Sequence, residues 1–410
     1  MASRAAPILR RKAAVAQPSW VGKRLAHDLL ISTPTSNSPS RPIIKSGPSS
    51  GGRSSLTGHT VTVFGCTGFL GRYLVSKIAQ LGTTVIVPYR DEDEKRNLRV
   101  MGDLGQIIPM EWDIRNPDQI AECMRHSDTV YNLAGRDWET RNFSFEDINV
   151  TGAKLIASVA ADLEVPRLIH VSHLNANPTS ESRFYQTKFQ GEQAVREVYP
   201  DATIVRPPGM FGPEDWLLNA IASYPTLFHL NAGQTKIRPA YVMDVAEALS
   251  VMLTAPRTSI GATFALPGPR TYTFQSLIEL VSAMTLKSHK APVLPKPVAL
   301  AFATVVNRAL WWPTVCPDEV RRKYIDDFGA HLHTAKSDSP AGWGTDAASV
   351  DAIVGVNGEH AKSWEDLNIT PTLLEEVAIT ILRRYRSAAT FDSPVELGGF
   401  KPPKAYHVVE

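Results

Sequence analysis

The chain has 410 residues, 43% of them hydrophobic and 20% charged, which suffices for one large core and a smaller satellite domain. Its net charge of +2 conceals an asymmetry: residues 1–90 hold twelve Lys or Arg and one acid, whereas the remainder holds 31 basic and 40 acidic residues. Because nucleic-acid binding requires a basic folded body, this acidic body excludes nucleic acid as a partner. The three cysteines have no paired spacing, so neither a disulfide framework nor a metal site is expected.

The first thirty residues are basic and otherwise rich in small and apolar side chains. Six Lys or Arg occur there, and no acid precedes Asp28. This composition is typical of a mitochondrial presequence, and a disordered basic tail is the alternative. Residues 31–58 are rich in Ser, Pro and Gly and are predicted to form a flexible linker.

A glycine-rich turn follows the first predicted strand, Thr60–Phe64, and leads into a predicted helix, Phe69–Gln80. Gly65 allows the chain to leave the strand sharply, Gly68 admits a pyrophosphate to bare backbone, and Gly71 lets the helix lie close to the sheet. The positive end of the helix faces the same phosphates. The turn therefore predicts a dinucleotide site whose contacts are Gly65, Thr67, Gly68, Phe69, Leu70 and Gly71.

Strand and helix patterns alternate from residue 60 to about residue 250. The further predicted strands are Thr83–Pro88, Ile107–Trp112, Thr129–Leu133, Arg167–Ser172 and Thr203–Arg206, and the further helices are Pro117–His126, Asn149–Leu163 and Arg183–Val198. Such alternation predicts a parallel sheet with helices on both faces. We therefore expect a Rossmann-type doubly wound α/β domain over residues 59–255, followed by a smaller α/β domain over residues 256–390.

The second predicted strand is followed by an arginine, Arg90, where NAD-binding folds usually place an acid. A planar, permanently charged guanidinium suits the 2′-phosphate of NADP(H). We therefore expect NADPH rather than NADH as the cofactor. The alternative is that Arg90 pairs with the four acids that follow it at positions 91–94.

Further candidate cofactor contacts lie at the ends of the next three predicted strands. Those at the third strand are placed to contact adenine, and those at the fourth place small residues and a turn beneath the cofactor. A serine at the end of the fifth is expected to cap the strand or to touch the cofactor. In chain order these residues are Asp113 and Ile114, then Leu133, Ala134 and Gly135, then Ser172.

The order of motifs between residues 58 and about 285 resembles the extended short-chain dehydrogenases and epimerases. The motifs are Gly65-x-x-Gly68-x-x-Gly71, Leu133-Ala134-Gly135, Arg206-Pro207-x-x-x-Phe211-Gly212 and Arg238-Pro239-x-x-Val242-x-Asp244-Val245-Ala246. More narrowly, residues 63–72, 130–136, 145–150 and 211–215 resemble the dehydrogenase-like accessory subunits of mitochondrial respiratory complex I. That resemblance implies one tightly held NADPH and a role in assembly or stability. It also implies a position on the matrix side of the inner membrane, in contact with complex I subunits of the peripheral arm near the membrane junction.

Active members of the wider family use a Tyr and a Lys four residues apart on one helix, where the Tyr exchanges a proton and the Lys holds the nicotinamide ribose. Here Lys188 is present, but Phe184 stands four residues before it and has no proton to exchange. Tyr185 is turned about 100° around the helix from Phe184. We therefore expect no catalytic residue. The alternatives are an active NADP-dependent reductase or epimerase that uses Tyr185 with Lys188, and a nucleotide-sensing regulator.

Beyond residue 255 the strand pattern fades, and an amphipathic helix is predicted over Thr271–Thr285. Residues 297–312 are mainly apolar, end in two tryptophans and are accompanied by Lys296 and Arg308. Tryptophan beside basic residues at an apolar boundary is typical of membrane interfaces, so we expect contact with lipid or a membrane-arm partner. A buried helix of the small domain is the alternative. The end, residues 391–410, is predicted to be an extended arm.

Overall fold

The computed structural model describes residues 58–224, 229–254, 259–287, 292–309, 316–327 and 360–392. The predicted presequence, nearly all of the predicted linker and the arm beyond residue 392 lie outside these ranges. So do the two tryptophans at positions 311 and 312.

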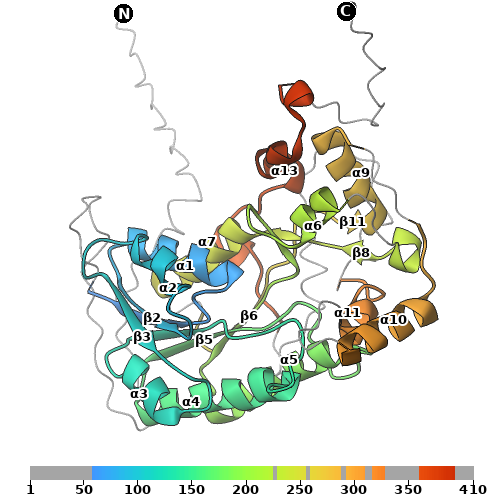
Figure 1. Cartoon of the computed structure of the whole chain (residues 1–410). Coiled ribbons are helices and arrows are strands. Elements are labelled where there is room, and N and C mark those ends of the chain that lie inside the picture. Colours follow the sequence, from blue (N-terminus) through green and yellow to red (C-terminus); the bar gives the residue numbers. More distant parts are fainter. Residues whose placement is uncertain are drawn as a thin grey trace, which may run out of the picture.

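A seven-stranded sheet, parallel throughout, forms the centre of the molecule, with strand order β10-β6-β5-β4-β1-β2-β3 (Figure 1). The strands are β1 Thr60–Phe64, β2 Thr84–Tyr89, β3 Ile107–Glu111, β4 Thr129–Asn132, β5 Arg167–Val171, β6 Thr203–Arg206 and β10 Thr263–Ala265. The chain runs outward from β1 to β3 and then returns to place β4 on the other side of β1. Ligands of such folds bind at this reversal, outside the carboxyl ends of the strands.

Two layers of helices cover the two faces of the sheet, which confirms the predicted doubly wound fold (Figure 1). One face packs against α1 Phe69–Gln80 and α7 Val242–Thr254. The other packs against α3 Pro117–Met124, α4 Ala153–Asp162 and α5 Arg183–Val198. Because both faces are covered, inner strands such as β4 are buried along their whole length, including the polar Thr129 and Asn132 at its two ends.

The sheet continues past residue 255, where the sequence pattern predicted that it fades. Strand β10 lies in the segment expected to belong to the smaller domain, yet it pairs in parallel with β6 through Thr263, Phe264 and Ala265. All three residues are buried, so the strand is too short and too uniformly covered to show an alternating pattern.

The remaining described elements stand mainly beside the sheet. They are α2 Lys95–Arg99, η2 Asp147–Gly152, α6 Leu217–Ser223, α9 Phe274–Thr285, α10 Lys296–Ala309, α11 Pro317–Arg322, α13 Leu374–Leu382 and the short turns η3 Leu230–Gly233, η5 Glu365–Leu367, η6 Arg383–Tyr385 and η7 Ala388–Thr390. Two small sheets pair β7 Met210–Phe211 with β9 Ala240–Tyr241, and β8 Lys236–Ile237 with β11 Tyr272–Thr273.

Two apolar clusters hold together the helices that stand beside the sheet. Helices α6, α9 and α13 share one cluster, and α10 and α11 share another. The predicted helix Thr271–Thr285 begins at Phe274 because the Thr273 side chain accepts a hydrogen bond from the Ser276 backbone N–H and caps it. The predicted 297–312 helix is described as α10, up to Ala309. In the ranges described, no helix has both the length and the apolar character needed to cross a membrane.

Candidate functional site

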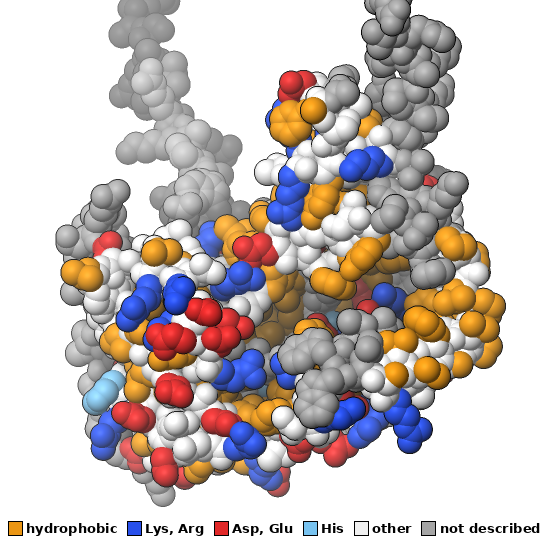
Figure 2. Space-filling model, in the orientation of Figure 1, with side chains coloured by type: hydrophobic (Ala, Val, Ile, Leu, Met, Phe, Trp, Pro, Cys, Tyr) orange, Lys and Arg blue, Asp and Glu red, His pale blue; other side chains and the backbone are white. Residues whose placement is uncertain are grey.

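A cavity of about 250 Å³ opens at the carboxyl ends of β1, β2 and β4, where the strand order reverses. It brings together most of the residues predicted to hold a nucleotide. These are Gly65, Thr67, Gly68, Arg90, Asp113, Ile114, Leu133, Ala134 and Gly135. A more open depression of about 570 Å³ adjoins it and shares Arg90 and Asp113 with it. We refer to the two adjoining spaces together as the trough, and the residues that line it all lie between positions 65 and 148. On the face drawn in Figure 2, the surface is also hollowed between the sheet domain and the C-terminal elements.

The glycine turn has the geometry that a close backbone approach requires. Gly65 has φ +80°, and a Cβ placed on it would lie 2.8 Å from the backbone carbon of Leu133. A Cβ on Gly71 would lie 2.3 Å from the Gly65 carbonyl oxygen, so only glycine lets α1 pack against the turn. Helix α1 has no side-chain cap and no acid in its first turn. Its first backbone N–H groups are therefore suited to an anion such as a pyrophosphate.

Three of the predicted contacts lie beneath the turn and not on the cavity wall. Leu70 is buried in the core cluster under β1, and Gly71 is the packing contact with Gly65. The ring of Phe69 stands edge-on to that of Tyr73, with 5.6 Å between centroids. The side chains of Leu70 and Phe69 and the close packing of Gly71 position α1. Any contact of these three residues with a phosphate would therefore come from their backbone.

Arg90 lines both spaces and is exposed. In the ranges described it forms no ion pair with the acids at positions 91–94. Of these, Glu92 pairs with Lys95, and Asp93 pairs with Arg96 at 3.0 Å. The guanidinium of Arg90 is therefore available to a ligand.

The carboxylate of Asp113 is engaged by an arginine that the sequence analysis did not single out. Arg115 donates to it from Nε at 3.1 Å and from Nη2 at 2.8 Å. These hydrogen bonds lower the pKa of Asp113. Arg115 lies over the Phe143 ring, and both line the cavity. The only signal in the sequence was the two-residue spacing from Asp113.

A third arginine, Arg136, also lines the cavity. Burial and the nearby Arg90 lower its pKa. The mouth of the site thus carries Arg90, Arg115 and Arg136, which gives it the charge that a phosphate-rich ligand requires.

At the inner end of the cavity, Gly135 adjoins two buried polar side chains, one of which has an unpartnered oxygen. A Cβ placed on Gly135 would lie 2.9 Å from Lys188 Nζ and 3.9 Å from Asn149 Oδ1. Lys188 and Asn149 are buried, and Asn149 Oδ1 has no hydrogen-bond partner in the described structure. Burial lowers the pKa of Lys188. Because unpartnered buried polar groups are costly, this end fits the hydroxyl groups of a ribose.

Ser172 is buried at the end of β5, and its Oγ is likewise without a partner among the described residues. The glycine turn, the basic mouth and these buried donors and acceptors together suit a dinucleotide. Ser172 is not among the described residues that line the cavity, so its predicted role with the cofactor stays a prediction.

Phe184 stands beside Lys188 on α5, at the position where the sequence analysis looked for a tyrosine. Lys188 Nζ lies 5.8 Å from the centroid of the Phe184 ring. The ring is buried and meets Phe145 edge-on at 5.7 Å. Arg322 of α11 places its guanidinium 4.6 Å from the centroid of the same ring. The space beside Lys188 is thus closed by side chains of this chain.

Tyr185 lies in the same buried cluster as Phe145 and Phe184, but its hydroxyl has a partner of its own. Its ring lies 4.9 Å from that of His173, and its hydroxyl hydrogen-bonds with Asn175, which in turn donates to Asp327 at 2.8 Å. Burial and the Asp327 charge raise the pKa of Tyr185 to about 12. An active tyrosine requires the opposite shift.

His173 is held neutral in the same buried group. Burial, with Arg322 and Lys188 nearby, lowers its pKa to about 3. Its Nδ1 accepts a hydrogen bond from the Asn175 backbone N–H at 3.1 Å.

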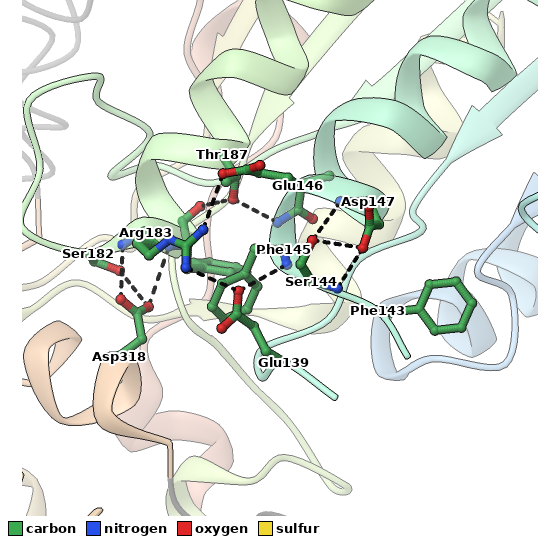
Figure 3. Close-up of polar contacts among 12 residues, drawn as sticks. Glu139, Phe143, Ser144, Phe145, Glu146, Asp147, Ser182, Arg183, Thr187 and Asp318 are labelled. Atoms are coloured by element: carbon green, nitrogen blue, oxygen red, sulfur yellow. Dashed lines mark hydrogen bonds and ion pairs between the residues drawn. The ribbon is translucent and has the colours of Figure 1, made fainter. Parts of the chain in front are cut away.

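The amino end of α5 is capped by a residue more than 130 positions away in the chain. Asp318 of α11 accepts hydrogen bonds from Ser182 Oγ at 2.8 Å, from the Arg183 N–H at 2.9 Å and from the Phe184 N–H at 3.4 Å (Figure 3). A carboxylate here satisfies free N–H groups and complements the helix dipole. Neither Asp318 nor Arg322 carries a sequence signal that would have identified it, because each acts through its tertiary position.

Comparisons with known proteins find relatives over most of the chain. The model of the NAD dependent epimerase/dehydratase family matches residues 61–265. The mitochondrial 40 kDa subunit of NADH-ubiquinone oxidoreductase from Neurospora crassa is 43% identical over 89% of this chain and 88% of its own length. The mitochondrial NADH dehydrogenase [ubiquinone] 1 alpha subcomplex subunit 9 of Rattus norvegicus is 39% identical over 84% of this chain and 85% of its own.

Among solved structures, a nucleoside-diphosphate-sugar epimerase from Staphylococcus aureus matches with a TM-score of 0.57 at 15% identity, over 78% of this chain and 99% of its own. At that identity the match supports the fold alone. The two subunits of higher identity identify the family more narrowly, because each match covers more than four fifths of both chains. The chain therefore belongs to the NAD dependent epimerase/dehydratase family and, within it, to the family of the 40 kDa or alpha subcomplex 9 subunits of NADH-ubiquinone oxidoreductase.

Proposed function

We propose that the protein is a non-catalytic accessory subunit of mitochondrial complex I that binds one NADPH as a structural cofactor and supports assembly or stability. The named relatives support membership of the complex. The observation that carries the non-catalytic role is Phe184, which stands beside Lys188 where a proton-exchanging tyrosine would be needed.

The residues of the trough divide the work of holding the nucleotide. The amino end of α1 and the bare backbone of Gly68 would take the pyrophosphate, and Arg90 the 2′-phosphate. Lys188 and Asn149 would take the nicotinamide ribose. A bound nicotinamide nucleotide would supply hydride-transfer chemistry, and the position four residues before Lys188 holds Phe184, which has no proton to complement it.

Binding to the folded state alone would stabilise the subunit. A ligand present at a hundredfold excess over its Kd contributes about 2.7 kcal/mol by mass action. This is a large share of the stability of an ordinary domain. Stabilisation by tightly bound NADPH would therefore explain why a subunit without catalytic activity has a dinucleotide site.

Two further features support the proposed location of the protein in mitochondria, at the inner membrane. The composition of residues 1–30 favours import into mitochondria, as the names of the relatives also suggest. On α10, Val298, Phe302 and Val305 recur at helical spacing and are 53%, 61% and 66% exposed. Figure 2 shows hydrophobic side chains gathered in that region.

Together with Lys296 and Arg308, this apolar face suits the matrix surface of the inner membrane, or a complex I subunit near the junction of its two arms. We propose that the protein is peripheral there and that α10 faces the membrane or such a partner.

The test is isolation of the protein from mitochondrial membranes, with identification of co-purifying subunits and of the nucleotide released by acid. We expect recovery in complex I with about one NADP(H) per chain. Gly68→Asp should remove the nucleotide by placing a negative charge at the pyrophosphate, and should lower the amount of assembled complex.

Gly209→Asp is the matched control, because a Cβ at Gly209 meets no atom within 4 Å. A free matrix protein with an exchangeable nucleotide, and a turnover that Tyr185→Phe abolishes, would contradict the proposal and favour an active reductase or epimerase.

A further inference from the structure

Residues 133–148 connect the cavity to the C-terminal helices. On one side, the segment supplies six residues of the cavity wall, which are Leu133, Ala134, Gly135, Arg136, Phe143 and Ile148. On the other side, Asp137 and Glu139 of the same segment contact arginines of α11 and α5. A ligand that orders one side of so short a segment also restrains the other.

The contact with α11 is made by Arg322. Its Nη2 donates to the Asp137 backbone carbonyl at 2.6 Å, and its Nη1 lies 3.6 Å from the Asp137 carboxylate. The Nε atom lies 3.7 Å from Asp318, the residue that caps α5. The side chain is only 15% exposed. Arg322 therefore bridges the cavity segment, the helix that carries Lys188, and its own helix.

The contact with α5 reinforces this arrangement (Figure 3). Arg183 lies 3.2 Å from Glu146 and 3.8 Å from Glu139, both in or beside the cavity segment. The Glu139 carboxylate also accepts a hydrogen bond from the Phe145 N–H at 3.3 Å. The segment is thus held between α5 and α11 by charged groups, which act only while its backbone is ordered.

Helix α11 in turn determines where α10 lies. Ala299 and Ala303 of α10 pack with Val320 of α11 in one apolar cluster. Lys296 of α10 stands over the ring of Tyr324, just after α11, at 5.1 Å. The exposed apolar face of α10 therefore depends on α11 for much of its placement, beside a half-exposed ion pair of Lys296 with Glu181 at 3.2 Å.

We propose that Arg322 is a positioning residue that couples nucleotide occupancy to the placement of α10 and α11. NADPH in the cavity orders residues 133–148, and the ordered Asp137 holds Arg322 and with it the two helices. The apolar face of α10 is then presented in a fixed position only by the loaded protein. The coupling rests on the proposed binding of NADPH. It is reciprocal, because docking of α11 must strengthen nucleotide binding by the same factor.

Amide hydrogen exchange of the full chain, with and without NADPH, tests the coupling. In the unaltered protein we expect NADPH to slow exchange in three places: the turn 65–71, the segment 133–148 and helices 296–309 and 317–322. In Arg322→Met the first two effects should remain and the third should disappear, with NADPH affinity about fivefold weaker or more.

Lys323→Met is the matched control, since the Lys323 side chain, just after α11, is half-exposed and among the described residues forms an ion pair only with Glu319, at 3.3 Å. It should retain the full response. Asp137→Asn is a second test in case Arg322→Met fails to fold. The Asp137 side chain is 70% exposed, so its replacement should be tolerated, and the hydrogen bond from Arg322 to the Asp137 backbone carbonyl is kept. It should weaken the response of α10 and α11 without abolishing it.

The outcomes separate the two proposals. If NADPH protects no residue of the 65–71 turn, NADPH binding itself is wrong and the coupling fails with it. If the turn is protected but α10 and α11 are not, or if they remain protected in Arg322→Met, nucleotide binding stands and the coupling is overturned.

Discussion

The two ends of the cavity differ in how this chain fills them. At the phosphate end, bare glycine backbone and the exposed Arg90 leave space for a ligand. At the inner end, Phe184 and Arg322 occupy the space beside Lys188. Under the proposed function, the chain keeps the half of the site that would bind a dinucleotide and fills the space beside Lys188 with its own side chains. The comparison teaches that the two halves of such a site are built from separate residues, so one can change without the other.

The largest expected effect comes from an arginine near the closed end. Arg206 and Glu192 form a buried pair with Nε to Oε1 at 2.9 Å, and Glu192 lies on α5 with Lys188. Arg206→Met leaves an uncompensated buried carboxylate, so the free energy of unfolding should fall by about 3–5 kcal/mol. Urea unfolding measures it. The double variant Arg206→Met with Glu192→Met should recover most of the loss, and equal losses in the two would refute the explanation.

An arginine at the open end should behave in the opposite way. Arg90→Ser should leave the stability of the nucleotide-free protein within about 0.5 kcal/mol, because the side chain is exposed. Affinity for NADPH should fall about 10- to 100-fold through loss of a charge-assisted contact, while affinity for NADH stays nearly unchanged.

Titration calorimetry with both nucleotides measures the difference. Arg96→Ser is the control, since Arg96 is exposed and pairs with Asp93. Equal losses for NADPH and NADH in Arg90→Ser would mean that Arg90 does not read the 2′-phosphate.

Lowering the pH should reduce the free energy of unfolding through protonation of His173, which lies at the closed end. Burial lowers its pKa from 6.5 to about 3, so the folded state binds this proton less readily than the unfolded state. Its contribution to stability is complete above pH 6.5 and declines as the pH falls toward 3. His173→Asn keeps an acceptor for the Asn175 N–H but removes the titration.

Between pH 7.5 and 5.5 the variant should therefore lose about 1.4 kcal/mol less than the unaltered protein. Urea unfolding at the two pH values measures this. Parallel losses in both proteins would assign the acid sensitivity to other groups, of which the buried His170 is the first candidate.

The smallest expected effect is that restoring a tyrosine at position 184 produces no catalytic activity. Phe184→Tyr restores a hydroxyl four residues before Lys188, yet Arg322 still lies 4.6 Å from the centroid of that ring and keeps the space closed. We expect no NADPH oxidation with short aldehydes, ketones or quinones, measured by absorbance of the reduced nicotinamide. Turnover in Phe184→Tyr alone would show that the closed end still admits a substrate.

Much of the binding end could be predicted from the sequence, because its chemistry is local. The turn 65–71 and helices α1 and α5 begin and end where the spacing of apolar residues and glycines predicted. The trough contains Arg90, Asp113 and Gly135, each taken from the residues that follow a strand. Strand ends of a parallel sheet meet at one edge, so a linear pattern is sufficient to place them together.

The closed end was decided by the tertiary structure. Phe184 was visible in the sequence as a missing acid, but its neighbour Arg322 is 138 positions away and has no motif. The same holds for Asp318 at the cap of α5, and for β10, whose three residues carry no periodic signal. Spacing along a chain encodes backbone conformation over a few turns. The pairing of distant side chains depends on how whole elements pack, and no local pattern records that.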